Sequence, residues 1–246
     1  MPDIPHSVIP PSISGAQLRA GLLLSRGSAP LGRLRGWLDA ALDLVFPPRC
    51  AGCGRVDTYW CDRCAREIDA LPLLGAVPAI EGLTGSAATA MHEGKLQEAV
   101  QALKYDNARP LAAVLARRLD SCLRHMNWTF DMIVPVPLHT TRLRERGYNQ
   151  SQLLGEHVAQ LQSIPCTSSA LRRWRSTATQ VGLSGEQRRA NVSDAFRAES
   201  QAIHSQSILL IDDVTTTGAT LQACALALYE AGARAVYSIT VTVARA

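Results

Sequence analysis

The stretch Ile208-Leu-Leu-Ile-Asp-Asp-Val-Thr-Thr-Thr-Gly-Ala-Thr220 decides the fold, because its chemistry changes twice within a few residues. The apolar run 208–211 is typical of a strand that is buried on both faces of a parallel sheet. Asp212 and Asp213 follow at the carboxyl end of this strand, which is the edge where ligands bind in such sheets. The threonines and Gly218 then supply hydroxyls and free backbone N–H groups where a helix starts, an arrangement that binds phosphate.

The acid pair points to a sugar rather than to the phosphate, because carboxylates repel an anion. Asp212 and Asp213 are better explained as acceptors of hydrogen bonds from ribose hydroxyls, or as neighbours of a divalent cation such as Mg²⁺. An ordinary strand and turn is the alternative interpretation, but it would tolerate many other residue types here. The stretch resembles the signature of type I phosphoribosyltransferases that binds phosphoribosyl pyrophosphate (PRPP). The resemblance assigns PRPP binding to Asp212, Asp213, Thr215, Thr216, Thr217, Gly218, Ala219 and Thr220.

Four of the seven cysteines have the spacing of a metal site. They occur as Cys50-x-x-Cys53 and Cys61-x-x-Cys64, with seven residues between the pairs. Two C-x-x-C turns provide the four sulfurs that structural Zn²⁺ prefers, and the short connection between them fits a small zinc ribbon. A redox site or a disulfide framework is the competing interpretation. A redox site needs only one such pair, however, and nothing in the sequence indicates secretion.

Length and composition fit a folded α/β protein with a small added module. The chain has 246 residues, of which 47% are hydrophobic and 19% charged, so it is not of the disordered class. A net charge of +4 is too small to indicate nucleic-acid binding by itself. No apolar run approaches the roughly 18 to 20 residues of a membrane span, and we expect a cytoplasmic protein.

The order of patterns along the chain predicts three parts. Residues 1–30, rich in proline, glycine and serine, are expected to form a flexible extension. Residues 31–70 should hold an amphipathic helix over 31–46 followed by the zinc ribbon, and residues 86–246 a mostly parallel sheet flanked by helices. Helices are predicted at 94–105, 110–126, 150–162 and from 221 to about 231. Strands are predicted at 86–91, 132–137, 196–198, 208–211 and 236–243.

Two basic stretches complete the predicted site. The strand 132–137 leads into a loop in which arginines alternate, and such a loop could bind a pyrophosphate. The second stretch is a long loop of the kind that covers a ligand. Solvated charged loops are the simpler alternative for both. The pyrophosphate loop comprises Val136, Pro137, Arg142, Arg144 and Arg146; the candidates in the second loop are Arg172, Arg173, Arg175 and Gln180.

Residues 40–246 as a whole resemble the ComF family, because the zinc module, V-P-V-P-L-H, R-E-R-G-Y-N-Q, R-W-R-S-T-A-T-Q and I-D-D-V-T-T-T-G-A-T occur in that order. The resemblance implies a type I phosphoribosyltransferase fold in which Asp212 and Asp213 bind ribose hydroxyls of PRPP–Mg²⁺ and residues 216–220 bind its 5-phosphate. It also implies a link to DNA uptake or DNA use, with DNA-uptake or helicase proteins as partners.

The acceptor of a phosphoribosyl group is not evident from the sequence, which leaves a second hypothesis open. In that hypothesis the chain is a non-catalytic module that binds single-stranded DNA through its arginines. Trp60, Tyr148 and Trp174 would then offer stacking surfaces for the bases.

Overall fold

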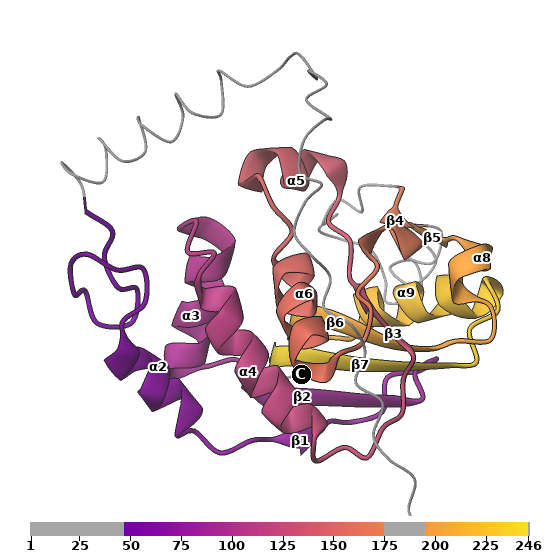
Figure 1. Cartoon of the computed structure of the whole chain (residues 1–246), viewed down its shortest axis with the longest axis horizontal. Coiled ribbons are helices and arrows are strands. Elements are labelled where there is room, and N and C mark those ends of the chain that lie inside the picture. Colours follow the sequence, from indigo (N-terminus) through magenta and orange to yellow (C-terminus); the bar gives the residue numbers. More distant parts are fainter. Residues whose placement is uncertain (1–46, 175–194, 246) are drawn as a thin grey trace, which may run out of the picture. The chain divides into compact units, whose positions relative to one another are not determined.

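A five-stranded sheet lies at the centre of the described structure (Figure 1). The computed structural model describes residues 47–174 and 195–245, so the predicted N-terminal extension, the predicted helix 31–46, Arg175 and Gln180 lie outside the described residues. The strand order is β1-β2-β7-β6-β3. Only β1 is antiparallel to its neighbour, so the mostly parallel sheet is confirmed. The strands are β1 Gly75–Ala76, β2 Gly85–Met91, β3 Met132–Pro135, β6 Ser207–Thr215 and β7 Ala235–Val243.

Strand β6 lies between β7 and β3, and its apolar residues contact both layers of helices. Leu209 and Ile211 pack into one hydrophobic cluster, whereas Ile208 and Leu210 pack into the other. This division follows from the alternation of side chains along a strand. All four side chains are fully buried, as the continuous apolar run predicts.

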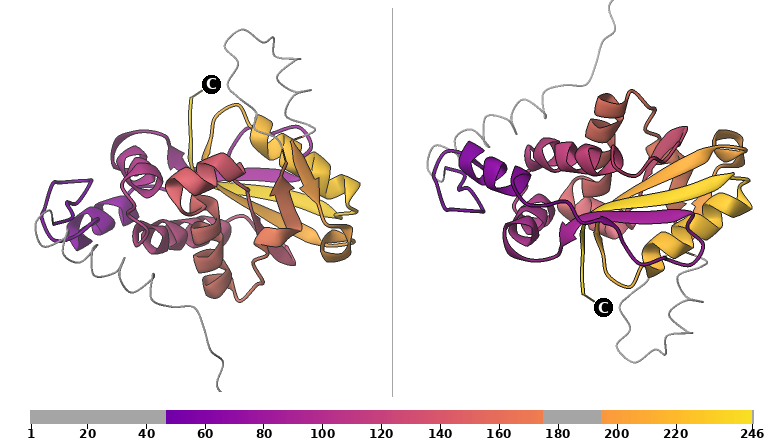
Figure 2. Two further views of the ribbon diagram at one scale, coloured as in Figure 1. Left: turned by 90° about the horizontal axis from the view of Figure 1, so that it is seen from above. Right: turned by 90° about the horizontal axis from the view of Figure 1, so that it is seen from below.

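Helices cover both faces of the sheet (Figure 2). Helices α3, α4 and α6 pack on one face, and α9 packs on the other together with a two-stranded sheet of β4 and β5. No helix in the described ranges is long and apolar enough to cross a membrane. The bounds on the first face are α3 Gly94–Tyr105, α4 Leu111–Leu123 and α6 Gln150–Gln162; those on the second are α9 Ala219–Glu230, β4 Leu171–Arg173, β5 Phe196–Ala198, η1 Ser168–Ala170 and α8 Ser200–Ile203.

Two predicted elements differ from the structure. The strand predicted at 208–211 continues to Thr215, because β7 runs beside it and pairs with Val214 and Thr215. The acid pair therefore lies inside the strand. The basic loop predicted after β3 is instead a short helix, α5 Thr140–Arg146. The His139 side chain accepts a hydrogen bond from the Thr141 amide at its start, and Gly147, at φ 78°, ends it.

The cysteine module packs against the same core as the sheet. Its helix α2, Asp62–Asp69, buries Cys64 and Ile68 in the hydrophobic cluster that also contains α3 and α4. Arg118 of α4 joins the two parts, because its buried guanidinium donates to the carbonyls of Ile68, Leu71 and Pro72 as well as to Thr89 of β2. The module is therefore held by polar contacts as well as by apolar packing.

Candidate functional site

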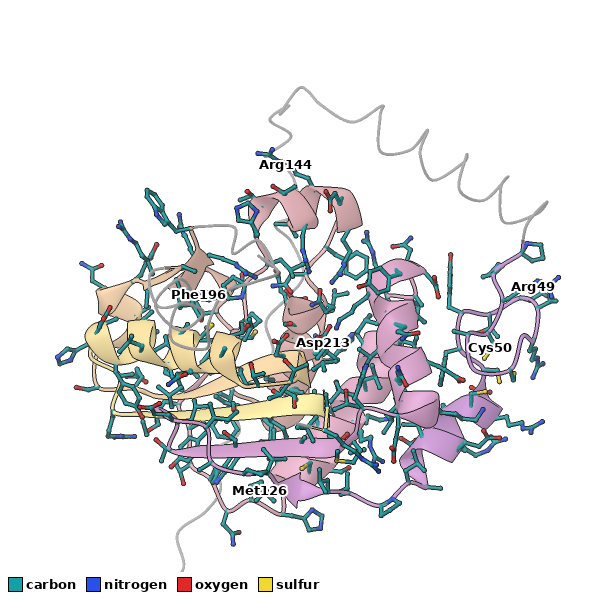
Figure 3. All side chains as sticks on the ribbon, turned by 180° about the vertical axis from the view of Figure 1, so that it is seen from behind. Arg49, Cys50, Met126, Arg144, Phe196 and Asp213 are labelled. Atoms are coloured by element: carbon teal, nitrogen blue, oxygen red, sulfur yellow. The ribbon has the colours of Figure 1, made fainter. Side chains whose placement is uncertain are left out.

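The acid pair lies at the carboxyl end of the sheet, and each carboxylate has different partners (Figure 3). The Asp213 Oδ1 atom lies 3.1 Å from the Lys104 ammonium at the end of α3. Its Oδ2 atom is buried and accepts no hydrogen bond from the residues described here. Asp212 instead accepts hydrogen bonds from the Ser151 hydroxyl at 2.7 Å and from the Asp213 amide at 2.9 Å. Within the described residues, Asp213 Oδ2 and Asp212 Oδ2 are therefore both left for a ligand.

The electrostatics of the pair are asymmetric. Burial raises the pKa of Asp212 to about 7, and the neighbouring Asp213 carboxylate adds to this shift, while the Ser151 hydrogen bond opposes it. His92 also lies near the acid pair, and burial and the Lys104 charge lower the pKa of the His92 ring. Its ring Nδ1 is 2.8 Å from the Thr242 hydroxyl. Sequence patterns did not indicate Ser151 or His92, since only the three-dimensional fold brings them to Asp212 and Asp213.

The threonine loop has the geometry of an anion site at the start of α9. Gly218 adopts φ 78° before the helix, and a Cβ atom there would meet Ile80 at 3.0 Å, so both conformation and space require glycine. Within the described part of the chain, the amides of Thr216, Thr217 and Gly218 donate to no carbonyl. The hydroxyl of Thr215 is buried without a partner there. These donors together suit a phosphate.

Helix α5 separates the three arginines that were predicted to line one loop. Arg142 and Arg146 are four residues apart and share one helix face, whereas Arg144 points away from the sheet (Figure 3). Alternate residues share a face in an extended chain but diverge in a helix, so the structure does not bring Arg144 together with Arg142 and Arg146. The other two line a cavity of about 550 Å³ beside the end of α3. Its lining comprises Lys104, Tyr105, Asn107, Arg142, Glu145, Arg146 and Tyr148.

The other residues of the two basic stretches lie in different surroundings. Val136 is buried, and its amide donates to the Ile211 carbonyl at 3.0 Å, which places Pro137 beside β6. Arg172 is exposed and pairs with Glu199 at 3.1 Å. Arg173 is more buried; burial lowers its pKa, the Cys224 thiol and Asp212 raise it, and Arg142 lowers it further. Arg142 and Arg173, from the two stretches, therefore lie close enough to repel each other.

Two of the three aromatic residues proposed to stack bases are inaccessible. Trp60 is buried over Gly52 in the cysteine module. Tyr148 is buried, donates its hydroxyl to the Leu103 carbonyl and has the Arg109 guanidinium over its ring. Only Trp174 is exposed, with Arg197 4.6 Å from its ring centroid. A row of stacking surfaces for DNA is therefore absent among these three residues.

The four cysteines converge as their spacing predicts. Their Sγ atoms all lie within 4.8 Å of one another, and a tetrahedral Zn²⁺ with bonds of about 2.3 Å needs sulfurs roughly 3.8 Å apart. Cys50 and Cys53 form a knuckle, in which the Gly54 amide donates to the Cys50 carbonyl at 2.7 Å. The second pair differs from the ribbon that was expected, because Cys61 precedes α2 and Cys64 lies in its first turn.

The surroundings of these sulfurs favour a bound cation. The Cys64 amide lowers the pKa of Cys61 to about 6, whereas burial and the other thiols raise that of Cys64 to about 12. A thiol with the raised pKa of Cys64 would lose its proton on binding a metal ion, which is how four such sulfurs could hold Zn²⁺. The Lys95 ammonium of α3 lies 3.6 Å from the Cys64 sulfur and donates to the Gly52 carbonyl at 3.1 Å, so it adds a second positive charge beside the cluster.

Comparison with known proteins gives relatives at the level of sequence. Competence protein F of Haemophilus influenzae is 30% identical over 181 residues, which cover 71% of this chain and 75% of that protein. The DNA utilization protein YhgH of Escherichia coli K12 is 36% identical over 146 residues, which cover 57% of this chain and 64% of that protein. No family model matches the chain.

Among solved structures, the glutamine PRPP amidotransferase of Bacillus subtilis has a TM-score of 0.39 and 19% identity, over 54% of this chain and 26% of that protein. A TM-score below 0.5 does not carry an assignment, which rests instead on the sequence relatives. Since the alignment with competence protein F spans three quarters of that protein, the chain belongs to the competence protein F (ComF) family.

Proposed function

We propose that this protein binds PRPP, together with Mg²⁺, at the carboxyl end of β6. The observation that carries the proposal is the unpaired state of Asp213 Oδ2 and the Thr215 hydroxyl, which are buried on β6 without partners in the described structure. Leaving a buried polar group unpaired costs about 1–3 kcal/mol, and more for a charged one. A ribose hydroxyl or a cation at Asp213, with a phosphate beside Thr215, would remove that cost.

Each part of PRPP has chemically matched residues nearby. The ribose hydroxyls would donate to Asp212 and Asp213, and the 5-phosphate would accept from the amides and hydroxyls of residues 216–220. Arg142 and Arg173 would face the diphosphate. Mg²⁺, when bound, neutralises charge on the departing diphosphate in phosphoribosyl transfer. Such a transfer needs charge stabilisation rather than a strong side-chain base, and the arginines supply it.

The names of the relatives support a cellular setting. Competence protein F and a DNA utilization protein suggest that this chain acts in DNA uptake or in the use of DNA. We propose that the protein acts in the cytoplasm, where PRPP would be available.

Isothermal titration with PRPP in the presence of Mg²⁺ tests the proposal. The wild type should bind, and the double variant Asp212→Asn/Asp213→Asn should lose at least about tenfold in affinity, or 1.4 kcal/mol. Asp131→Asn is a matched control, because this carboxylate pairs with Arg234 and precedes β3 at the opposite edge of the sheet. Equal heats for the wild type and the double variant would exclude the site.

A further inference from the structure

The cavity beside α3 adjoins the acid pair and is larger than a diphosphate needs. Lys104 lines it and also lies 3.1 Å from Asp213 Oδ1, so a ribose held by the acid pair would lie next to this cavity. Its volume of about 550 Å³ falls within the range of roughly 300–1,000 Å³ that is usual for sites of small organic ligands. We call the end of the cavity formed by Tyr105, Asn107 and Arg146 the Tyr105 pocket.

The charge of the cavity favours an anion. Lys104, Arg142 and Arg146 line it, and among its lining residues in the described ranges Glu145 is the one carboxylate. Within residues 47–174 and 195–245, neither arginine forms an ion pair with a carboxylate. A cavity with two unneutralised guanidinium groups stabilises negative charge in its occupant.

The Tyr105 pocket also offers a flat surface. The Tyr105 side chain is 74% exposed, which is unusual for a large aromatic residue. The Arg146 guanidinium carbon lies 5.5 Å from the centroid of its ring, so the two planar groups border the same space. Asn107 Oδ1 accepts from Arg109 Nε at 3.1 Å, which leaves the side-chain NH₂ of Asn107 as a donor. A ligand with a planar ring and polar atoms at its edge matches the Tyr105 ring, the Arg146 guanidinium and the Asn107 amide.

The two arginines of α5 divide the cavity. Arg142 lies one helical turn before Arg146 on the same helix face, away from the Tyr105 ring, and its guanidinium suits the diphosphate of PRPP. Arg146 lies one helical turn further on, beside Tyr105 and the end of α3. The Tyr105 pocket therefore remains for a second ligand when the diphosphate lies near Arg142.

We propose that the Tyr105 pocket binds the acceptor of the phosphoribosyl group, and that this acceptor is a small planar aromatic carboxylate. This assignment rests on the proposed function, because the adjoining acid pair must bind the ribose of PRPP. A ring or amine nitrogen of the acceptor forms the bond to C1 of the ribose. The C1–O bond to the diphosphate breaks and the diphosphate leaves with the electron pair. A nitrogen that carries a hydrogen then loses it as a proton to solvent, whereas a pyridine nitrogen keeps the positive charge.

A small molecule fits better here than a strand of DNA. Binding of successive bases requires several exposed aromatic side chains along a basic groove. Tyr148, the other aromatic residue of the cavity, is buried with its ring covered by Arg109. A single accessible ring in a bounded cavity suits one planar group.

Ligand-detected NMR titration tests the inference with paired probes. Orotate, nicotinate and anthranilate are compared with uracil, nicotinamide and anthranilamide, which keep the rings but lack the carboxylate. At least one carboxylate should bind about tenfold more tightly than its neutral counterpart. Tyr105→Ala and Arg146→Gln should each weaken that binding by about tenfold, and Tyr105→Phe should restore it. Arg144→Gln, on the outer side of the same helix, should leave it unchanged.

Three results would overturn the inference: no preference for a carboxylate, equal effects of Arg146→Gln and Arg144→Gln, or a Tyr105→Ala variant that loses affinity only for oligothymidylate. The last result would assign the ring to DNA. Titration of the wild type with PRPP is made separately. If PRPP binds and the aromatic carboxylates do not, only the acceptor site fails; if they bind and PRPP does not, the proposed function fails.

Discussion

Asp212 and Asp213 are neighbours in sequence but differ in chemical state. Asp213 faces the Lys104 ammonium at the end of α3, whereas Asp212 lies against the Ser151 hydroxyl at the start of α6. The Lys104 ammonium balances the charge of Asp213, whereas Asp212 accepts a hydrogen bond from the neutral Ser151 hydroxyl. Burial and the Asp213 charge accordingly raise the pKa of Asp212 to about 7.

The raised pKa of Asp212 predicts how ligand affinity depends on pH. In the folded protein this pKa is about 7, against 3.8 for an ordinary aspartate, so Asp212 makes folding less favourable as pH rises from about 4 to 7. A ribose hydroxyl or a cation favours the charged form. Affinity for PRPP–Mg²⁺ should therefore fall below pH 7, approaching tenfold for each pH unit.

Calorimetry at pH 6, 7 and 8 measures this dependence. Asp212→Asn is the control that separates the protein from the ligand, since the variant should retain only the pH dependence of PRPP itself. The same slope in the wild type and the variant would show that Asp212 is not the titrating group.

At the scale of elements, helix α4 fastens the cysteine module through a single side chain. Arg118 is almost fully buried and makes five hydrogen bonds, three of them to carbonyls at and beyond the end of α2. Burial lowers the pKa of its guanidinium, which nevertheless stays charged. Without it, the Leu71 and Pro72 carbonyls would lose this donor, whereas the Ile68 carbonyl would keep its hydrogen bond from the Leu71 amide.

Arg118→Ala is predicted to lower the free energy of unfolding by about 3–5 kcal/mol, because it removes the five hydrogen bonds of a buried side chain and opens a cavity. Arg117→Ala removes an exposed arginine from the same helix and should change stability by no more than about 0.5 kcal/mol. Chemical denaturation monitored by circular dichroism compares the two. Similar losses would mean that Arg118 does not fasten the module.

Sequence patterns predicted those elements whose signal is local. The apolar run of β6 and the spacing of the apolar residues in α3 and α6 are such signals, and the two helices have the bounds that were expected. The length of β6 depended on pairing with β7, which no local pattern records. The conformation of α5 depended on a histidine cap and on Gly147, so alternating arginines gave the wrong geometry there.

The residues of the candidate site also form two groups: those that a local sequence pattern identifies, and those that only the fold brings together. The acid pair, the threonine loop and the four cysteines were each contiguous or regularly spaced, and their positions followed from the sequence. Ser151 and His92 reach the site from other parts of the chain, so only the fold identifies them. Tyr148 and Trp60 were misjudged because composition says nothing about burial.

For the whole molecule, the metal site forms part of the main core. Cys50, Cys61 and Cys64 are buried in the cluster that also holds α3 and α4. Loss of a bound metal would therefore expose thiols and apolar groups inside that core rather than in a separate module. Metal binding and overall stability are then linked.

We predict one Zn²⁺ per chain, which Cys64→Ser removes. The midpoint of thermal unfolding should fall by about 10 °C, which at this size corresponds to roughly 3 kcal/mol. Cys166→Ala is the control, since this cysteine lies outside the four-sulfur cluster and should keep both the metal and the stability. Elemental analysis and calorimetry give the two quantities. Full zinc content in Cys64→Ser would contradict the prediction.

Helix α3 carries a lysine at each end that contacts a different site. Lys95, in its first turn, reaches the Cys64 sulfur, and Lys104, in its last turn, reaches Asp213. A helix of twelve residues is about 18 Å long and behaves as a stiff rod. Any sliding or tilting of α3 must therefore displace both ammonium groups together. A shift of the helix at the sulfur cluster would thus be transmitted to the acid pair.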